Sequence, residues 1–307
     1  MPDADNTTSY KCPVNLPDLQ NEEDTRGVEI DRVGITNVKF PIKVRRKPLE
    51  PKKHEYDEVS ADVRLFVGLP HNYKGVNMSR FTECLVEFSR HTISMSSMPD
   101  LLISLQEKLK SKDAYARFEF DYYIDKTAPV SKKTAPMAYR CAFTGIKRNG
   151  TTDFILEVNV IAASLCPCSR GMSLLDQLLK EGDSNGLIPV TIRNKVGMGA
   201  HNQRSQIRVQ IICKEKEFLW IEDLVDLIEA QASAPTYPIL KRPDEKFVTE
   251  QAYNNAKFSE DIARDTHLAL QANEKIEAFS VKVENEESIH PYNCTSYTKS
   301  VEWKYSY

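Results

Sequence analysis

Residues 138–164, AYRCAFTGIKRNGTTDFILEVNVIAAS, decide the fold class. Apolar and polar side chains alternate on both sides of Asn149-Gly150, which is the period of a half-buried β-strand. Asn-Gly is also the dipeptide that most strongly favours a two-residue β-hairpin turn. The stretch therefore predicts two antiparallel strands, 138–147 and 151–164, joined by a tight turn.

Further strands and helices are predicted on both sides of this hairpin. Alternation predicts strands at 36–46, 59–69, 114–125, 205–213, 277–284 and 296–305. Apolar residues spaced by three and four predict helices at 78–91, 97–112 and 219–233, and a long helix around 248–272. Ser97 or Asp100 is suited to cap the second of these helices. Each half of the chain follows the order strand, strand, helix, helix, strand, strand.

This order predicts an α+β fold of two tandem ββααββ units, each an antiparallel sheet with a helix pair on one face. We assign residues 36–148 to the first unit and 149–307 to the second. Residues 1–35 are mostly polar and are expected to form an extended arm. A segment at 170–198 interrupts the second unit as an excursion between two strands. Such units leave open sheet edges, so oligomerisation is expected.

Composition and charge exclude several classes of protein. The chain has 307 residues, 41% of them apolar, which is enough for a sizeable core. Its 41 basic and 44 acidic residues leave a net charge of −3, so there is no global positive field for nucleic acid. The sequence has neither a run of about 20 apolar residues nor a signal peptide. We expect a soluble cytoplasmic protein without nucleic-acid or membrane partners.

Cysteine and histidine residues supply the first candidates for chemistry. Seven cysteines in a long chain argue against a disulfide framework. The one close pair, Cys166-Pro-Cys168, has too short a spacer for a structural zinc knuckle. His201, in GMGAHNQRS, follows glycines that let the backbone approach a ligand. His290, in VENEESIH, follows a run of carboxylates.

The carboxylates are harder to rank. Pattern alone leaves Glu245, in KRPDEKFVTE, and Glu260, in AKFSEDIARD, as ordinary helix charges. A cysteine, a histidine and a carboxylate together could form a three-ligand catalytic metal site with an open position for water. Spacing cannot assemble such a site, because the candidates are far apart in the sequence.

Six stretches of the sequence together resemble one family. They are IDRVGITNVKFPI, LPHNYKGVNMSRF, SLCPCSR, GAHNQRSQIRV, YPILKRPDEKFVTEQAYNNAKFSEDIARD and VENEESIH. In this order, from about residue 18 to 292, they resemble the bacterial type IB GTP cyclohydrolases, the FolE2 family. The resemblance implies the tunnelling fold (T-fold), with two strand-and-helix units per chain, and a homotetramer with sites near the subunit interfaces.

The resemblance also implies an activity and the residues behind it. The activity would be conversion of GTP to 7,8-dihydroneopterin triphosphate and formate, the first step of folate and pterin biosynthesis. The implied metal ligands are Cys166, His201 and Glu245, for a divalent manganese, zinc or iron ion. The implied guanine anchor is Glu260, and the remaining catalytic residues are Cys168, Glu287 and His290. Cations that flank the motifs and could hold the triphosphate are Arg80, Arg204, Lys241 and Arg242.

These residue types suit the reaction. Opening guanine at C8 needs an activated water and a proton for N7, and a bound metal can bring the pKa of water to about 7. His290 suits proton donation because an unperturbed imidazole has a pKa of about 6.5. Glu287 would orient His290 or relay protons if a bend brings the two together. The Glu260 carboxylate could accept both N1–H and N2–H of guanine.

Two alternatives and two departures from the family pattern accompany this interpretation. An archaeal-type relative would instead form a 2′,3′-cyclic phosphate product, and a non-catalytic T-fold protein would only bind purines. Asn77 stands where the family usually has histidine. The 170–198 excursion is longer than the usual linker between Cys166 and His201. We expect it to project near the mouth of the site and to gate access.

Overall fold

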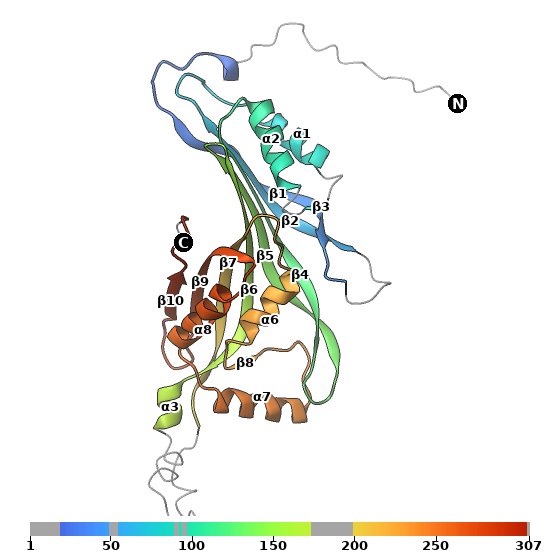
Figure 1. The fold of residues 1–307 in the computed structure, drawn as a ribbon, viewed down its shortest axis with the longest axis vertical. Coiled ribbons are helices and arrows are strands. Elements are labelled where there is room, and N and C mark those ends of the chain that lie inside the picture. The colour runs from blue at the N-terminus through green and yellow to red at the C-terminus, as the bar shows by residue number, and fades with distance from the viewer. Residues whose placement is uncertain (1–18, 49–54, 89–91, 94–96, 173–198, 306–307) are drawn as a thin grey trace, which may run out of the picture.

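A long, twisted, mostly antiparallel sheet with helices packed on it forms the molecule in the computed structural model (Figure 1). The structure describes residues 19–48, 55–88, 92–93, 97–172 and 199–305. The excursion predicted at 170–198 thus lies almost entirely outside the described residues, and so do residues 1–18 of the predicted arm. The α+β prediction is confirmed.

Ten strands build the sheet, in the order β10-β9-β7-β6-β5-β4-β2-β1-β3, and β8 pairs with β6 outside this path. Their bounds are β1 Ile30–Arg45, β2 Tyr56–Leu69, β3 Thr92–Ile93, β4 Ala114–Thr127, β5 Thr134–Arg148, β6 Thr151–Leu165, β7 Asn202–Cys213, β8 Ala234–Pro235, β9 Ile276–Glu286 and β10 Cys294–Lys299. Among these described strands, only β1 and β3 pair in parallel.

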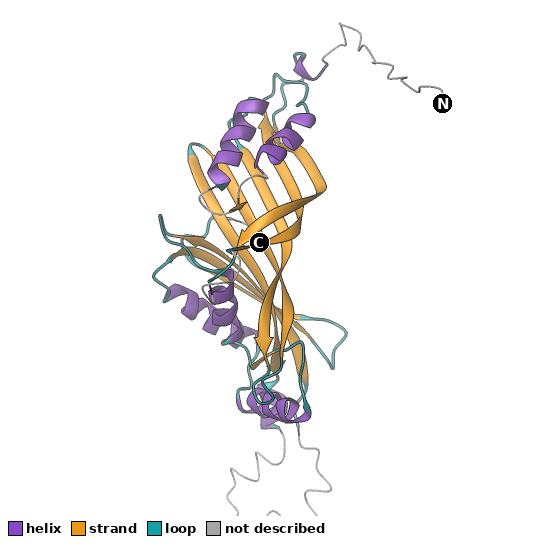
Figure 2. Ribbon diagram, turned by 90° about the vertical axis from the view of Figure 1, so that its right-hand side faces the viewer, coloured by secondary structure: helices purple, strands orange, loops and turns teal. Residues whose placement is uncertain are grey.

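The described helices are η1 Leu19–Asn21, α1 Ser79–Phe88, α2 Met98–Leu109, α3 Pro167–Gly171, α6 Ile221–Glu229, α7 Arg242–Asn254 and α8 Ser259–Gln271. Helices α1 and α2 lie over one end of the sheet and α6 and α8 farther along the same face, as Figure 2 shows. Helix α7 lies across the end of the sheet near α3 (Figure 1). None of these helices has both the length and the apolar character needed to cross a membrane.

The predicted hairpin around Asn149-Gly150 is confirmed. Asn149 and Gly150 have φ values of 51° and 79°, which is the left-handed conformation that a type I′ turn requires. Strands β5 and β6 pair from Arg148 and Thr151 onward. The hairpin places both strands at the centre of the sheet.

Three predicted elements differ from the observed ones. The long helix expected around 248–272 is two helices, α7 and α8, because the chain turns at 255–258 and Asp261 caps the second helix by accepting a bond from Phe258 N–H at 3.0 Å. The strand predicted at 296–305 ends at Lys299. Strand β1 begins at Ile30, within the predicted arm.

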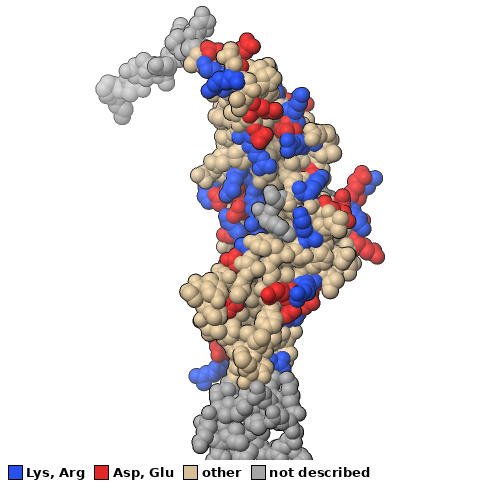
Figure 3. Space-filling view, turned by 90° about the vertical axis from the view of Figure 1, so that its left-hand side faces the viewer, with Lys and Arg blue, Asp and Glu red and all other residues tan. Residues whose placement is uncertain are grey.

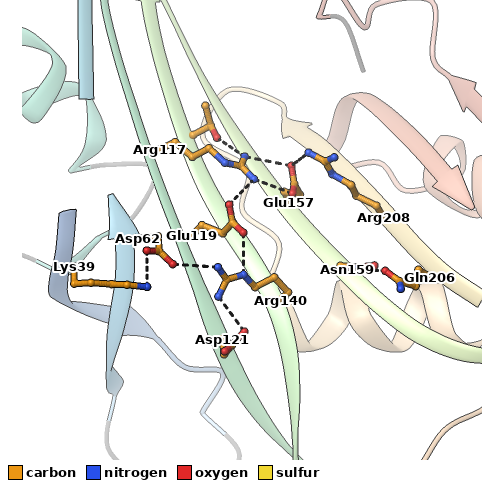
Figure 4. Close-up of polar contacts among 11 residues, drawn as sticks. Lys39, Asp62, Arg117, Glu119, Asp121, Arg140, Glu157, Asn159, Gln206 and Arg208 are labelled. Atoms are coloured by element: carbon orange, nitrogen blue, oxygen red, sulfur yellow. Dashed lines mark hydrogen bonds and ion pairs between the residues drawn. The ribbon is translucent and has the colours of Figure 1, made fainter. Parts of the chain in front are cut away.

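The face of the sheet turned away from α2 and α6 carries a network of charged side chains (Figure 4). Its centre is Glu157, which pairs with Arg117 at 2.9 Å and Arg208 at 2.8 Å. The network continues through Arg140, which pairs with Glu119 at 2.9 Å and with Asp62 at 3.3 Å. Cross-strand pairs of opposite charge keep this face polar and stabilise the strand register.

Acidic and basic side chains are interspersed on the side of the molecule drawn in Figure 3. Such mixing accords with the net charge of −3 and provides no broad positive surface on that side.

Candidate active site

Two antiparallel strands bring Cys166 and His201 together. The last pair of the β6–β7 ladder is Leu165 with Asn202, so the residues just beyond each strand end face one another. The backbone N–H of Cys166 donates to the His201 carbonyl at 3.1 Å. The strand register therefore joins two predicted metal ligands that are 35 residues apart in sequence.

A short turn of helix fixes the Cys166 side chain. Cys166 is the N-cap of α3, and its Sγ accepts the backbone N–H of Ser169 at 3.4 Å. The Ser169 hydroxyl in turn accepts the backbone N–H of His201 at 3.3 Å. These bonds fix the position of the Cys166 sulfur relative to the backbone of His201.

The His201 ring is engaged by a glutamine and a glutamate. His201 Nδ1 lies 3.0 Å from Gln203 Oε1, and Gln203 Nε2 donates to Glu287 Oε1 at 3.2 Å. Glu287 Oε2 is 3.8 Å from His201 Nδ1. The Glu287 side chain is only 7% exposed and that of His201 17%. Within one chain, Glu287 is thus a carboxylate in direct reach of the imidazole.

A chain of hydrogen bonds between buried polar residues joins the strands that carry this cluster. Ser205 Oγ donates to Asn285 Oδ1 at 2.5 Å, and Asn285 Nδ2 donates to Ser164 Oγ at 3.2 Å. Ser164 Oγ donates to the Lys257 carbonyl at 2.9 Å. These bonds join β6, β7 and β9 to the segment before α8, so the strand ends that carry the site are held in one geometry.

Cys294 and Glu260 lie on the neighbouring edge of the cluster. Cys294 pairs with Asn285 across the β9–β10 ladder. The pKa of the Cys294 thiol is raised by partial burial, by the charge of Glu287, by a hydrogen bond to Glu287, and by the charge of Glu260. Glu260 is exposed at the start of α8, next to Ser259, whose hydroxyl is 2.9 Å from its Oε2. The predicted guanine anchor thus borders the thiol, imidazole and carboxylate cluster.

Glu245 is placed differently from the other predicted ligands. It is exposed near the start of α7, whereas the end of that helix meets α3, where the Arg170 guanidinium lies 5.0 Å from the Tyr253 ring. Eight residues of helix separate Glu245 from Tyr253, a rise of about 12 Å. Lys241 and Arg242 lie with Glu245 at the remote end of the helix.

Asp244, the neighbour of Glu245, anchors that end of α7. Its buried carboxylate accepts the backbone N–H groups of Val130 and Ser131 in the β4–β5 turn, both at 2.8 Å. It also accepts the N–H of Lys241 at 2.8 Å. Although burial opposes ionisation, these hydrogen bonds hold the pKa of Asp244 below its usual range.

The remaining predicted residues take no part in the hydrogen bonds described above. Arg204 points to the opposite face of β7 from Gln203 and lies 3.7 Å from Glu286. Arg80 lies on α1 at the other end of the sheet, where it donates to the Lys108 carbonyl at 2.7 Å. His290 is exposed and stacks on Tyr292, with ring centroids 4.9 Å apart. Cys168 is exposed on α3.

The described part of one chain contains no group of three histidine, cysteine, aspartate or glutamate side chains placed to hold a metal ion. The backbones of Cys166 and His201 nevertheless meet at the strand ends, and a thiol with an imidazole is a donor set that suits zinc or iron. The donor types fit a metal, and a third ligand would have to come from outside this pair.

Gln203 and Cys294 are members of the cluster that the sequence analysis did not single out. Gln203 follows His201 by two residues, and strand alternation would have placed both on one side of β7. Cys294 carried no comparable signal, because its place depends on the β9–β10 pairing.

The chain is similar to known proteins over most of its length. The model of the family "Type I GTP cyclohydrolase folE2" matches residues 16–296. GTP cyclohydrolase FolE2 of Geobacter sulfurreducens is 42% identical over 278 residues, covering 91% of this chain and 95% of that protein. FolE2 of Magnetococcus marinus is 38% identical, covering 93% and 96%.

A solved structure, uricase from Arthrobacter globiformis, superposes with a TM-score of 0.53 at 5% identity, covering 90% of this chain and 96% of that one. At this identity the likeness shows a shared fold alone. The family match and the identity to curated relatives extend over most of the chain, and so over the strands that carry the cluster. The chain therefore belongs to the FolE2 family of type I GTP cyclohydrolases.

Proposed function

We propose that this GTP cyclohydrolase opens the guanine ring of GTP at C8, releases formate and yields 7,8-dihydroneopterin triphosphate for folate or related pterin synthesis. The observation that carries the proposal is the adjacency of Cys166 and His201 at the ends of β6 and β7. A purine-binding protein without catalysis would not need a cysteine next to a histidine whose ring lies beside a buried carboxylate.

We propose that Cys166 and His201 hold a divalent manganese, zinc or iron ion. Such an ion would supply a Lewis acid that lowers the pKa of water into the neutral range. The chain's own residues then bind and orient the base. Glu260 would accept N1–H and N2–H of guanine, a contact that adenine cannot make.

Proton delivery to N7 would fall to His290, with Cys168 also near the reacting base. His290 lies beyond the end of β9, on an exposed segment. Glu287 is committed to Gln203 in this chain, which favours a positioning role for it over a partnership with His290.

We propose that a second subunit completes the site in a homotetramer. Glu245 lies far along α7 from Cys166, and Arg80 lies at the other end of the sheet, so one chain does not gather the whole implied set. Among the described residues, the sheet also ends in the edge strand β10, and β1 is covered by only the two residues of β3. Both observations support pairing between chains.

Mixing two inactive variants tests this sharing. Cys166→Ala and Glu245→Ala subunits would each be inactive alone, and mixed tetramers would recover part of the activity because some sites would receive both native residues. No recovery in verified mixed tetramers would contradict a site shared in this way.

We further propose that the single sheet is built from two tandem ββααββ units, divided near residue 148, and that the enzyme is cytoplasmic. The order of the strands supports this division, because β1 to β5 form one half of the sheet and β6 to β10 the other.

The reaction is tested by incubating metal-reconstituted protein with GTP and following formate, pterin absorbance and product mass. Formate with the mass of dihydroneopterin triphosphate supports the proposal. A product mass of the 2′,3′-cyclic phosphate would favour the archaeal-type alternative. No product with manganese, iron or zinc would refute the proposed function.

A further inference from the structure

We propose that Gln203 is a positioning residue. Its hydrogen bond to Glu287 fixes the orientation of its amide group, and the amide oxygen then fixes the tautomer of His201. The inference rests on the proposed metal site, since it explains how His201 is prepared to ligate. It concerns the chain's own hydrogen bonds and can be measured without turnover.

The first step is the orientation of the Gln203 amide. A carboxylate only accepts hydrogen bonds, so the group of Gln203 that faces Glu287 must be its NH₂. The structure has this arrangement, with Nε2 donating to Glu287 Oε1 at 3.2 Å. A flipped amide would set two oxygens against each other, and Glu287 therefore determines which way Gln203 points.

The second step is the tautomer of His201. With its NH₂ group directed at Glu287, Gln203 presents Oε1 to His201 Nδ1 at 3.0 Å. An amide oxygen accepts and cannot donate, so Nδ1 must carry the proton. In the neutral ring the other nitrogen, Nε2, then keeps its lone pair, and this is the form of imidazole that ligates a metal.

The third step is the rigidity of the hydrogen-bond chain that runs from Glu287 through Gln203 to His201. Gln203 is only 8% exposed and lies on β7 opposite Ser164 of β6, so its side chain has little freedom to turn. His201 is tied on its backbone side to Ser169 and Cys166. Hydrogen bonds to the ring and to the backbone of His201 thus position the imidazole before any ligand binds.

Loss of an outer hydrogen bond to a metal-ligating histidine typically lowers metal affinity by about 10 to 100-fold. We expect Gln203→Met, which keeps the length of the side chain and removes both polar groups, to weaken zinc binding by that factor in a chelator competition. The matched control is Gln206→Met, which removes the Gln206–Glu286 bond of 2.7 Å on the opposite face of the same strand. The control is expected to bind zinc as the native protein does.

A double variant tests whether the hydrogen bond between positions 203 and 287 orients the acceptor that faces His201. Gln203→Glu with Glu287→Gln keeps an acceptor towards Nδ1 and a hydrogen bond between positions 203 and 287, with the charge exchanged. We expect it to recover most of the affinity that Gln203→Met loses, whereas Gln203→Glu alone sets two carboxylates together and should not.

The tautomer itself is measured in the metal-free native protein by ¹⁵N spectra of labelled histidine, assigned with a His201→Asn variant. We expect His201 protonated on Nδ1, and a mixture of tautomers in Gln203→Met. An Nε2-protonated ring in the native protein, or unchanged zinc affinity in a folded Gln203→Met variant, would overturn the inference. If the native protein bound no metal, the metal-site proposal would fail, while the tautomer measurement would still decide the inference.

Discussion

Replacing Glu157 with glutamine tests the charge network that crosses the sheet. Glu157 accepts bonds from Arg117 at 2.9 Å, from Arg208 at 2.8 Å and from Gln210 at 2.6 Å, and its side chain is only 10% exposed. Glutamine keeps the shape but removes the charge between two guanidinium groups. The NH₂ group of the glutamine would also face N–H donors at a position where the carboxylate oxygen accepts hydrogen bonds.

The size of the effect follows from the exposure of the partners. Arg117 is 12% exposed, and removing the partner of a buried charge costs about 3 to 5 kcal/mol. Arg208 is 44% exposed, so solvent screens its pair and it adds less than about 1 kcal/mol. One amide acceptor survives in Glu157→Gln, and we therefore expect a loss near the lower bound, about 3 kcal/mol.

The assay is urea unfolding at fixed chain concentration, because the proposed association of subunits would also contribute to the unfolding free energy. Asp121→Asn is the control, since Asp121 is 51% exposed and pairs with Arg140 at 3.3 Å. The control should change stability by less than about 0.5 kcal/mol. A loss in Glu157→Gln no larger than that of the control would refute the reasoning.

The same variant has a defined pH signature. Burial alone would raise the pKa of Glu157, but the hydrogen bonds and charges of Arg117 and Arg208 outweigh it and hold the pKa below the ordinary 4.5. A lowered pKa in the folded state stabilises the protein fully above pH 4.5, and this contribution is lost as the pH falls through the folded value. The stability gap between native protein and Glu157→Gln should therefore narrow on acidification.

Three further predictions concern other parts of the fold and site. Asp244→Asn should lower both the melting temperature and GTP turnover, because it weakens the bonds that anchor α7, while exposed Glu250→Gln should leave both unchanged in calorimetry and a formate assay. Gly145→Ala should cost about 1 to 3 kcal/mol in urea unfolding, because its Cβ would lie 2.4 Å from Cγ of the buried Met98; a neutral result would show that Met98 can move. Glu260→Gln should lower kcat/KM for GTP through loss of guanine affinity, and unchanged kinetics would remove Glu260 from the site.

The strands were predictable because alternation is a local property. Both arms of the Asn149-Gly150 hairpin were placed within a few residues of the observed ends. The expected helix at 248–272 failed because its apolar spacing continues across the break. The turn at 255–258 and the cap by Asp261 use residues that also occur inside helices, so the break was hidden.

The site was predictable only in part, because it depends on strand register. The resemblance supplied Cys166, His201 and Glu287, but their contact follows from the pairing of β6, β7 and β9. Alternation along β7 already separates Arg204 from Gln203, and applying it would have weakened the nomination of Arg204. A resemblance names residues without saying where in the fold they lie, and Glu245, near the start of α7, lies away from Cys166 in this chain.

Metal content and formate release measured on the same preparations test the central claim most directly. Native protein reconstituted with metal should hold about one ion per chain and release many equivalents of formate from GTP. Cys166→Ala should lose most of both while remaining folded. Equal metal in native protein and variant, or undiminished formate release by the variant, would contradict the assignment of Cys166 and His201 as the catalytic metal centre.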